Sequence, residues 1–283
     1  MAKTLTEAQV RKYHRDGYVF PMRALTEAEA AEALRHVEDF ERDQGLEAQA
    51  KLVFKAHLPF RWLSDLIRHP GILDAVEDVL GPNILCWGTS FFQKNAHDSR
   101  FVSWHQDSYY YGLDPSDTLT AWVALTPSNL ESGCVRVLPG TQNGHRYVDF
   151  ANEPDENNLL PRGQTIKGLD LSGAVPMVLR PGEFSMHHEA LIHGSDPNRS
   201  DHRRVGISIH YIAPHVKRVK YNKDGVRPRA ALVRGVDDHG HWEHEPRTAA
   251  EFDPAALASL DAMRAEFFSR NNEGAFFDKP VRH

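Results

Sequence analysis

Residues 204–212 read RVGISIHYI, and this run is the clearest indication of the fold class. Neighbouring residues of a β-strand point to opposite faces, so the run divides into two sets. Small or polar side chains occupy one face and come from Arg204, Gly206, Ser208 and His210. Large apolar side chains occupy the other face and come from Val205, Ile207, Ile209 and Tyr211. We therefore expect a strand whose polar face lines a cavity and whose apolar face packs in the core.

Short β-rich runs of this kind recur through the middle of the chain, separated by Gly, Pro, Asn and Asp. They span residues 84–93, 119–125, 134–138, 174–179, 183–187 and 205–212. Such spacing is typical of an antiparallel sandwich or barrel and differs from that of alternating βαβ units. The segment 152–173 is too long and polar for a hairpin turn, and long segments of that kind are usually lids or disordered.

The flanks of this β-rich region show helical spacing. Thr6 and Thr26 are the expected N-caps of two helices, and shorter helices are expected at 59–68 and 71–80. Residues 254–270 return to helical spacing. We expect a single domain over residues 1–283, made of a helical N-terminal part to about residue 81, a β core over about 83–215 and a C-terminal extension over about 216–283.

Composition argues against several classes of protein. The formal net charge of −6 gives no footprint for nucleic acid. No apolar stretch approaches the roughly 18 to 20 residues that cross a bilayer, and the N-terminus lacks a secretory signal, so we expect a cytoplasmic protein without a membrane partner. Cys86 and Cys134 are expected to be reduced packing residues. A basic run at 215–229 is either a solvated loop or a rim that attracts an anionic substrate. The oligomeric state stays open.

The 17 histidines justify a search for metal ligands. Residues 101–112 read FVSWHQDSYYYG, and in an extended segment the side chains of His105 and Asp107 point to the same side. One imidazole and one carboxylate can then reach a single ion, and His193 in HHEALIHGSDPNRS is the leading third ligand. Two His and one carboxylate form the facial triad of non-haem Fe(II) oxygenases, which leaves positions open for a bidentate co-substrate and O2.

Arg204 makes the metal interpretation more specific. It lies eleven residues after His193, on the polar face of the predicted strand. A fixed guanidinium there holds a carboxylate with two hydrogen bonds, and the distal carboxylate of 2-oxoglutarate is the obvious candidate. Two alternatives stay open at this point: Arg204 pairs with a surface Asp, or the H-x-D sequence has a structural role.

Two longer runs resemble the phytanoyl-CoA dioxygenase family, which includes ectoine hydroxylase. They are WHQDSYYYGLDPSDTLTAWVALTPSNLESGCVRVLPGTQNGH at 104–145 and PGEFSMHHEALIHGSDPNRSDHRRVGISIHYI at 181–212. The resemblance covers about residues 5–215 and implies that the β core is a double-stranded β-helix, the cupin-like jelly roll. It further implies that the iron ligands are His105, Asp107 and His193, and that the 2-oxoglutarate carboxylate binds Arg204.

The resemblance also implies a co-substrate site and a reaction. Ser195 is expected to help hold 2-oxoglutarate, and Gln93 to lie beside it. Relatives that halogenate carry a small residue where this chain has Asp107, so the resemblance implies hydroxylation here. In the implied reaction, 2-oxoglutarate and O2 give succinate and CO2 while an unactivated C–H bond of a small-molecule substrate is hydroxylated. The metal and the co-substrate carry that chemistry, so no side-chain acid or base is required.

Aromatic residues flank the predicted triad and either line a substrate pocket or pack the barrel. Tyr109, Tyr111 and Trp122 are the candidates for pocket lining. His187 and His188 are expected to be mainly structural, because two more imidazoles would crowd the open metal positions.

Other functions stay open. The same triad performs desaturation or cyclisation on natural products. A non-catalytic cupin-like binding protein would share the fold, but it would have no use for a carboxylate-binding Arg204. A zinc-type hydrolase or isomerase would show no dependence on 2-oxoglutarate. The substrate is not specified, since the basic run favours an anionic group and the tyrosines favour an aromatic or ammonium-bearing molecule.

Overall fold

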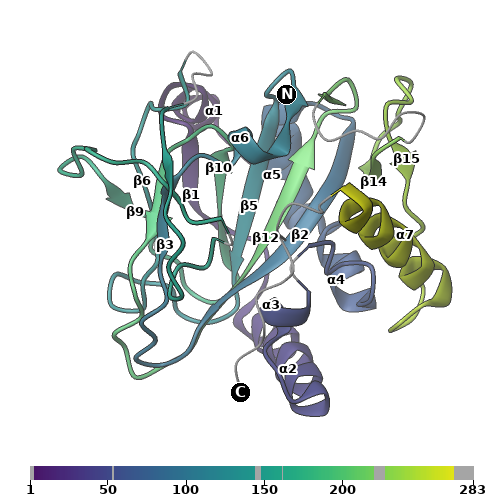
Figure 1. The fold of residues 1–283 in the computed structure, drawn as a ribbon. Helices are drawn as coiled ribbons and strands as arrows, with labels where there is room; N and C mark the ends of the chain where they lie inside the picture. The colour runs from purple at the N-terminus through teal and green to yellow at the C-terminus, as the bar shows by residue number, and fades with distance from the viewer. Residues whose placement is uncertain (1–2, 53, 144–147, 161, 220–226, 271–283) are drawn as a thin grey trace.

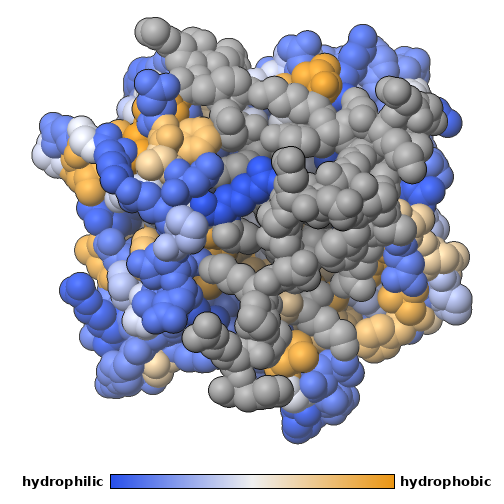
Figure 2. All heavy atoms as spheres, viewed as in Figure 1, coloured by the Kyte–Doolittle hydropathy of each residue, from blue (hydrophilic) through white to orange (hydrophobic). Residues whose placement is uncertain are grey.

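The protein is described here from a computed structural model that covers residues 3–52, 54–143, 148–160, 162–219 and 227–270. Two β-sheets face each other, and helices cover the outer side of the larger sheet (Figure 1). In the described part of the chain, no helix is both long enough and apolar enough to span a membrane. Among the residues coloured in Figure 2, hydrophilic ones cover more of the surface than hydrophobic ones.

The larger sheet has seven strands in the order β1-β10-β5-β12-β2-β14-β15. Their bounds, in chain order, are β1 Tyr18–Arg23, β2 Ile84–Lys94, β5 Thr118–Ala124, β10 Glu183–His188, β12 Arg204–Ile212, β14 Arg229–Arg234 and β15 Glu243–His244. All of its pairings are antiparallel except β14 with β15. The run at 204–212 is therefore strand β12, with β5 on one side and β2 on the other.

The smaller sheet has the order β3-β11-β6-β9 and is fully antiparallel. Its strands are β3 Val102–His105, β6 Val135–Val137, β9 Val175–Pro176 and β11 His193–Ser195. Two short ribbons complete the β structure, β4 Leu113–Asp114 with β13 Lys217–Arg218, and β7 Ala151–Asn152 with β8 Gln164–Thr165. Two facing antiparallel sheets in this arrangement confirm the predicted jelly roll.

Seven helices lie in the described residues: α1 Glu7–Asp16, α2 Glu27–Gln44, α3 Ala48–Lys51, α4 Arg61–Leu66, α5 Pro70–Leu80, α6 Ser108–Tyr111 and α7 Pro254–Arg270. Thr6 and Thr26 cap α1 and α2 as predicted, each in a capping box with a residue three positions later. The apolar face of β12 packs in one core with residues from α1, α2, α4 and α5. The polar face of β12 therefore points toward the smaller sheet.

Three features differ from the sequence expectations. Strand β1 lies in the part predicted to be helical, and its Pro21 suits the sheet edge that it occupies. The predicted strand at 174–179 is only Val175–Pro176. The C-terminal extension contributes β14 and β15 to the larger sheet, so the β structure does not end near residue 215.

A buried ionic cluster ties this C-terminal segment to the loop before α4. The carboxylate of Glu245 lies 2.5 Å from Lys55 Nζ and 3.0 Å from His57 Nε2. Lys55 Nζ also donates to the Arg229 carbonyl at 2.8 Å, and His57 Nδ1 lies 3.0 Å from Thr89 Oγ1. Burial acts to raise the pKa of Glu245, but Lys55 and His57 hold it at about 2. The carboxylate is therefore the counter-ion on which the buried Lys55 depends.

Replacing Glu245 with Gln is expected to lower the free energy of unfolding by about 3 kcal/mol, because breaking a buried ion pair leaves a charge without a partner. Urea denaturation measures the change. Arg247→Ala is the matched control, since Arg247 pairs with Asp65 at the surface, and such pairs contribute at most about 1 kcal/mol. Equal effects of the two substitutions would contradict a special role for the buried cluster.

Candidate metal centre

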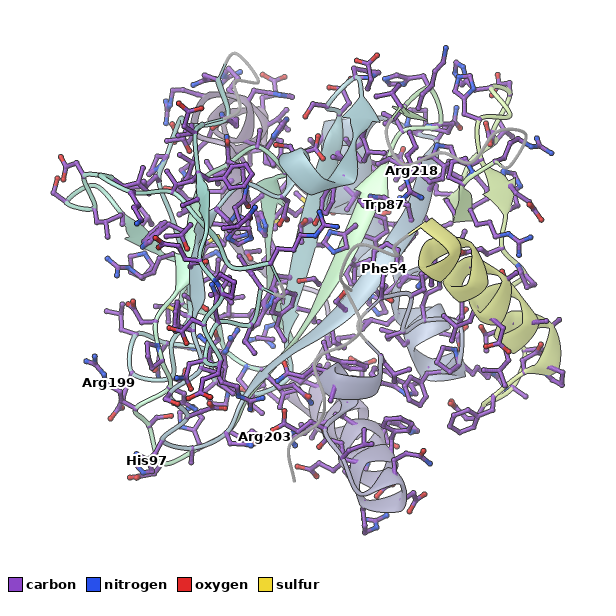
Figure 3. The ribbon with its side chains drawn as sticks, viewed as in Figure 1. Phe54, Trp87, His97, Arg199, Arg203 and Arg218 are labelled. Carbon is purple, nitrogen blue, oxygen red and sulfur yellow. The ribbon has the colours of Figure 1, made fainter. Side chains whose placement is uncertain are left out.

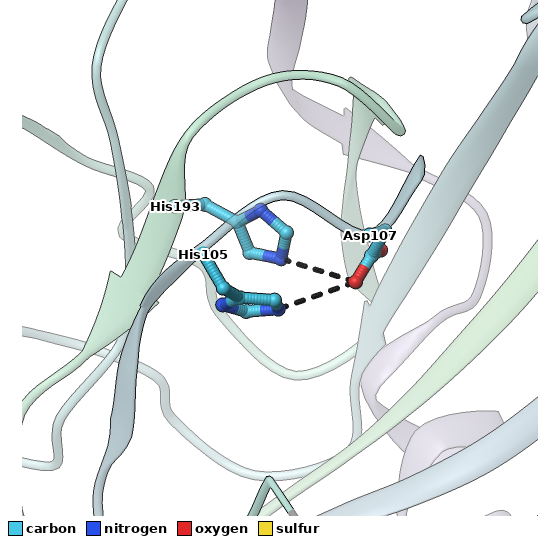
Figure 4. Close-up of side chains that lie close together, drawn as sticks. All are labelled: His105, Asp107 and His193. Atoms are coloured by element: carbon cyan, nitrogen blue, oxygen red, sulfur yellow. Dashed lines mark hydrogen bonds and ion pairs between the residues drawn. The ribbon is translucent and has the colours of Figure 1, made fainter. Parts of the chain in front are cut away.

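Three side chains from two neighbouring strands converge between the sheets. His105 ends β3, His193 begins β11, and the two residues are directly paired in the antiparallel register. Asp107 follows two residues after His105. One ligand atom from each of the three residues lies within 4.8 Å of the others (Figure 4). The sequence therefore named residues that the fold brings together.

The backbone orients both imidazoles toward Asp107. His105 Nδ1 lies 2.8 Å from the Ser103 carbonyl, and His193 Nδ1 lies 2.9 Å from the Leu191 carbonyl. A carbonyl only accepts, so each Nδ1 carries the proton and donates, which leaves the Nε2 lone pair free. The two Nε2 atoms lie 3.2 Å and 4.0 Å from Asp107 Oδ1. Two imidazole lone pairs and a carboxylate thus point at one volume.

The electrostatics of the cluster favour metal binding. Burial lowers the pKa of His193 to about 4, with His105 acting in the same direction. Burial acts to raise the pKa of Asp107, but His193 and His105 hold it well below its usual range. At neutral pH His193 is therefore a neutral imidazole and Asp107 a carboxylate, which are the protonation states that bind a divalent metal ion.

Asp107 reaches the cluster by a different route from the one expected. The strand ends at His105, and Asp107 has helical backbone angles just before α6. The bend is held by Gln106, whose Nε2 donates to the Ala190 carbonyl at 2.7 Å and whose Oε1 accepts from the Val148 amide at 2.9 Å. The Ser108 amide also donates to the Glu189 carbonyl at 3.1 Å. A continued extended strand was therefore the wrong geometry, although the two side chains do lie close together.

A second polar site adjoins the cluster and carries two buried basic side chains. Arg204 on β12 and Lys94 on β2 are directly paired, and both side chains are buried. Among the described residues, Nε and Nη2 of Arg204 have no hydrogen-bond partner. Lys94 Nζ donates to Ser195 Oγ at 2.7 Å and to the Asp196 carbonyl at 2.5 Å. Ser195 lies two residues after His193 on β11, so Arg204 and Lys94 lie close to the metal cluster.

The pKa values of Arg204 and Lys94 show that too little negative charge lies nearby to offset the burial of these two basic groups. Burial lowers the pKa of Arg204 to about 10. Burial, and then the neighbouring Arg204, lower the pKa of Lys94 to about 6. Buried polar groups in native structures normally have partners, so unpartnered guanidinium nitrogens beside a buried lysine indicate a site for an anionic ligand.

Trp122 shapes the same site. It lies on β5 opposite Ser208, and the guanidinium of Arg204 sits 5.2 Å from the centre of its ring. A Cβ on Gly206 would come within 1.9 Å of this indole, so only glycine leaves room for it. Trp122 therefore lies on the inner face of the larger sheet, beside Arg204.

Gln93 does not reach the site. Its side chain points to the opposite face of β2, where its Nε2 donates to Glu41 at 3.0 Å and its Oε1 accepts from the Gln49 amide at 3.1 Å. Alternation assigns the inward position to Lys94, one residue later. Sequence reasoning missed Lys94, and the signal that could have found it is its register opposite Arg204.

The remaining candidate residues are two tyrosines and two histidines, and they do not all lie on the inner face of the larger sheet. Tyr111 lies beside the cluster, where burial and the Asp107 carboxylate raise the pKa of its hydroxyl. The side chain of Tyr109 lies outside the described residues. His187 faces inward with its ring centre 4.7 Å from that of His193, whereas His188, the next residue along β10, points to the opposite face.

His210 is a further inward residue that sequence reasoning placed on the polar face but gave no role. Its Nδ1 lies 3.0 Å from Thr120 Oγ1 and 3.3 Å from the Tyr111 hydroxyl. Burial lowers the pKa of His210 to about 4, so the ring is neutral near pH 7. The polar face of β12 therefore runs from a buried cation at Arg204 to a neutral imidazole at His210.

Comparison with known proteins assigns the family. The family model described as phytanoyl-CoA dioxygenase matches residues 13–206. The chain belongs to the phytanoyl-CoA dioxygenase family. The match includes the three clustered residues, Lys94 and Arg204.

Individual relatives agree with this membership. A probable phytanoyl-CoA dioxygenase of Caenorhabditis elegans is 30% identical over 161 residues, which are 53% of this chain and 50% of that protein. A probable alpha-ketoglutarate-dependent hypophosphite dioxygenase of Stutzerimonas stutzeri is 30% identical over 164 residues, 56% of this chain and 55% of that protein. This chain thus spans about half the length of the curated relatives that it matches.

Solved structures match over more of the chain. The non-heme monooxygenase ThoJ, in its apo form, superposes with a TM-score of 0.80 at 33% identity, covering 93% of this chain and 96% of ThoJ. A nickel complex of ThoJ superposes with a TM-score of 0.75. This chain thus shares its fold with a non-heme monooxygenase that has also been solved as a nickel complex.

Proposed function

We propose that this protein is an Fe(II)- and 2-oxoglutarate-dependent dioxygenase that hydroxylates a C–H bond of a small molecule. In this proposal His105, Asp107 and His193 hold the iron. The observation that carries it is the buried His–Asp–His cluster next to Arg204, a buried cation with unpartnered nitrogens. A metal site alone would also suit a binding protein or a hydrolase, but neither has a need for a carboxylate-binding guanidinium beside the metal.

The residues fit the metal and the co-substrate. Two neutral imidazoles and one carboxylate are the donor set of the facial triad. Both imidazoles have fixed rings and the correct tautomer because Ser103 and Leu191 accept their Nδ1 protons. The cation of Arg204 and the amine of Lys94, whose ammonium form a bound carboxylate favours, suit a dicarboxylate whose far end must be held. The Stutzerimonas relative, by its name, depends on alpha-ketoglutarate.

Iron(II) with 2-oxoglutarate and O2 supplies the oxidising chemistry, in which 2-oxoglutarate loses CO2 to give succinate and one oxygen atom enters the substrate. The protein contributes position and environment. Arg204 and Lys94 bind and orient the distal carboxylate, and Ser195 adds a hydroxyl contact. Asp107 contributes the third protein ligand, and this favours hydroxylation over halogenation. Trp122 covers Arg204 and helps exclude water from the ion pair.

Oxygen-dependent formation of succinate tests the proposal. The purified protein is incubated with Fe(II), ascorbate and 2-oxoglutarate in air, with small-molecule candidates added to stimulate turnover. We expect succinate only when iron, 2-oxoglutarate and O2 are all present, and we expect a chelator to stop its formation. Binding of neither iron nor 2-oxoglutarate would overturn the proposal, because a missing substrate does not prevent either from binding.

Lys94 gives a pH dependence that the proposal predicts. Without a ligand its amine is mostly neutral above about pH 6, and a bound carboxylate favours the ammonium form, so binding takes up a proton. Affinity for 2-oxoglutarate is therefore expected to fall as pH rises from about 6.5 to about 9, by at most about tenfold per pH unit. Calorimetry on nickel-loaded protein measures it, and Lys94→Met is expected to flatten the profile. An identical slope in the variant would contradict this role.

A further inference from the structure

The inner face of the larger sheet has a second end, opposite the two basic side chains. His210 lies six residues beyond Arg204 on β12, a separation of about 20 Å along the strand. The metal cluster lies between these two residues. At the Arg204 end, Lys94 contacts Ser195, two residues after His193. At the His210 end, burial and the Asp107 carboxylate raise the pKa of the Tyr111 hydroxyl, which lies 3.3 Å from His210 Nδ1. The co-substrate end and the His210 end therefore lie on opposite sides of the metal ligands.

A β-bulge gives this second end an extra side chain. Along β12, His210 pairs with Gly88 of β2, but the next residue, Tyr211, pairs with Cys86. Trp87 is the unpaired extra residue, and a bulge of this kind re-aims a side chain and is frequent beside active sites. The ring centre of Trp87 lies 5.7 Å from that of His210 and 4.6 Å from that of Tyr111. The irregularity thus adds an indole to the inner face.

Phe54 completes an aromatic wall. Its ring lies edge-on to Trp87, with 5.5 Å between centres, and Figure 3 labels both residues beside β2. A Cβ on Gly88 would lie 2.3 Å from the Phe54 ring and 3.2 Å from the His210 ring, so glycine lets these two side chains meet. Phe54 and Tyr111 are only half-buried, whereas Trp87 and His210 are buried.

The loop that carries Phe54 is held rather than free. The next residue, Lys55, has a left-handed backbone with φ of 59°, and its amine is fixed by Glu245 and the Arg229 carbonyl. A non-glycine residue in this conformation persists only when its surroundings enforce it. The buried ionic cluster therefore fixes the position of Phe54 in the wall.

Two polar atoms on this wall are available to a ligand, and one is the buried Trp87 Nε1, which has no hydrogen-bond partner among the described residues. Two hydroxyls, from Thr120 and Tyr111, engage His210 Nδ1. Within the described part of the chain, Nε2 of His210 has no hydrogen-bond partner. The wall made of Phe54, Trp87, Tyr111 and His210 contains no charged side chain, in contrast with the co-substrate end.

We infer that this aromatic wall is the substrate subsite and that it takes a neutral molecule with a flat unsaturated ring and a hydroxyl or carbonyl oxygen that meets His210. The inference rests on the proposed oxygenase function and narrows its substrate class. Ring faces and edges pack favourably on Phe54, Trp87 and Tyr111. The four wall residues themselves carry no charged side chain, so they favour a neutral ring over an anionic group such as a phosphonate or an acyl-CoA phosphate.

Binding of four matched probes tests the inference. They are acetophenone, with a ring and a carbonyl; ethylbenzene, with the ring alone; 2-octanone, with the carbonyl alone; and phenylphosphonate, with a ring and an anion. Saturation-transfer NMR on the metal-free full chain ranks their affinities. We expect acetophenone to bind most tightly, and Phe54→Leu to weaken it about fivefold. Phe252→Leu is the control, since Phe252 is a surface residue that packs on Phe60, away from the wall.

Preference for 2-octanone or phenylphosphonate, or an equal effect of the two leucine variants, would overturn the inference. The binding measurement uses no iron, so its result is separate from the oxygenase assay. Succinate formation without the expected probe ranking refutes the subsite and leaves the oxygenase standing. The expected ranking with no iron or 2-oxoglutarate binding refutes the oxygenase and leaves only a ring-binding site.

Discussion

Replacing His193 with alanine is expected to abolish oxygen-dependent succinate formation and to weaken metal binding by more than about 100-fold. Removing residues that merely orient metal ligands already costs 10- to 100-fold, and loss of a ligand costs more. The fold should survive, because His193 lies on a short strand and its ring contacts the polar residues His105, Asp107 and His187 and the Leu191 carbonyl. Calorimetry with nickel(II) measures binding independently of turnover.

His188→Ala is the matched control for this substitution. His188 comes from the same HHEALIH run but points to the opposite face of β10 from His187. We expect it to bind nickel as the wild type does. If both alanine variants bound metal normally, the assignment of His193 would be wrong; if both lost it, the effect would be a general disturbance of the segment.

Replacing Arg204 with alanine is expected to raise the KM for 2-oxoglutarate by about 100-fold while leaving metal affinity unchanged. Truncating one partner of a buried charge pair costs about 2 to 5 kcal/mol, and about 2.7 kcal/mol corresponds to 100-fold. Steady-state kinetics over a range of 2-oxoglutarate concentrations separates KM from kcat.

Arg203→Ala provides the comparison, because Arg203 is the preceding residue and faces outward toward α2. It pairs with Glu41 at 2.7 Å (Figure 3). We expect its KM to stay within about twofold of the wild type. Similar KM values for the two variants would show that Arg204 does not bind the co-substrate.

Much of the fold was predictable because β periodicity is visible in a single sequence. The polar and apolar faces of 204–212 follow directly from alternation, and the apolar face does lie in the core. Strand β1 was not predictable, since it is short, contains Pro21 and adjoins helix-rich sequence. Its place at the sheet edge depends on pairing with β10, more than 150 residues away.

Residue types, spacing and family resemblance were enough to predict which candidate ligands lie together, but not the local backbone geometry or the strand register. The three residues that the sequence pointed to, His105, Asp107 and His193, do lie together, but the turn at Asp107 depends on contacts from Gln106 to distant backbone. Gln93 was placed in the site and Lys94 missed, because a shift of one residue exchanges the faces of a strand and the register opposite Arg204 is set by the fold.

The aromatic wall was only partly accessible to sequence reasoning. Tyr111 was named as a candidate, but Trp87 and Phe54 were not. A bulge inserts Trp87 into the inner face, and no periodicity in the sequence marks that extra residue. Phe54 is placed by a buried pair between Lys55 and Glu245, residues that are separated by most of the chain.

The most direct test of the central claim is an anaerobic titration of 2-oxoglutarate into the iron(II)-loaded protein, followed by visible absorption. Chelation of iron(II) by 2-oxoglutarate gives a metal-to-ligand charge-transfer band, so the band reports both ligands in one site before any turnover. The account predicts a saturable band in the wild type, none in His193→Ala, and a band in Arg204→Ala that needs about 100-fold more 2-oxoglutarate. Iron-loaded wild type without the band, or an undiminished band in His193→Ala, would contradict it.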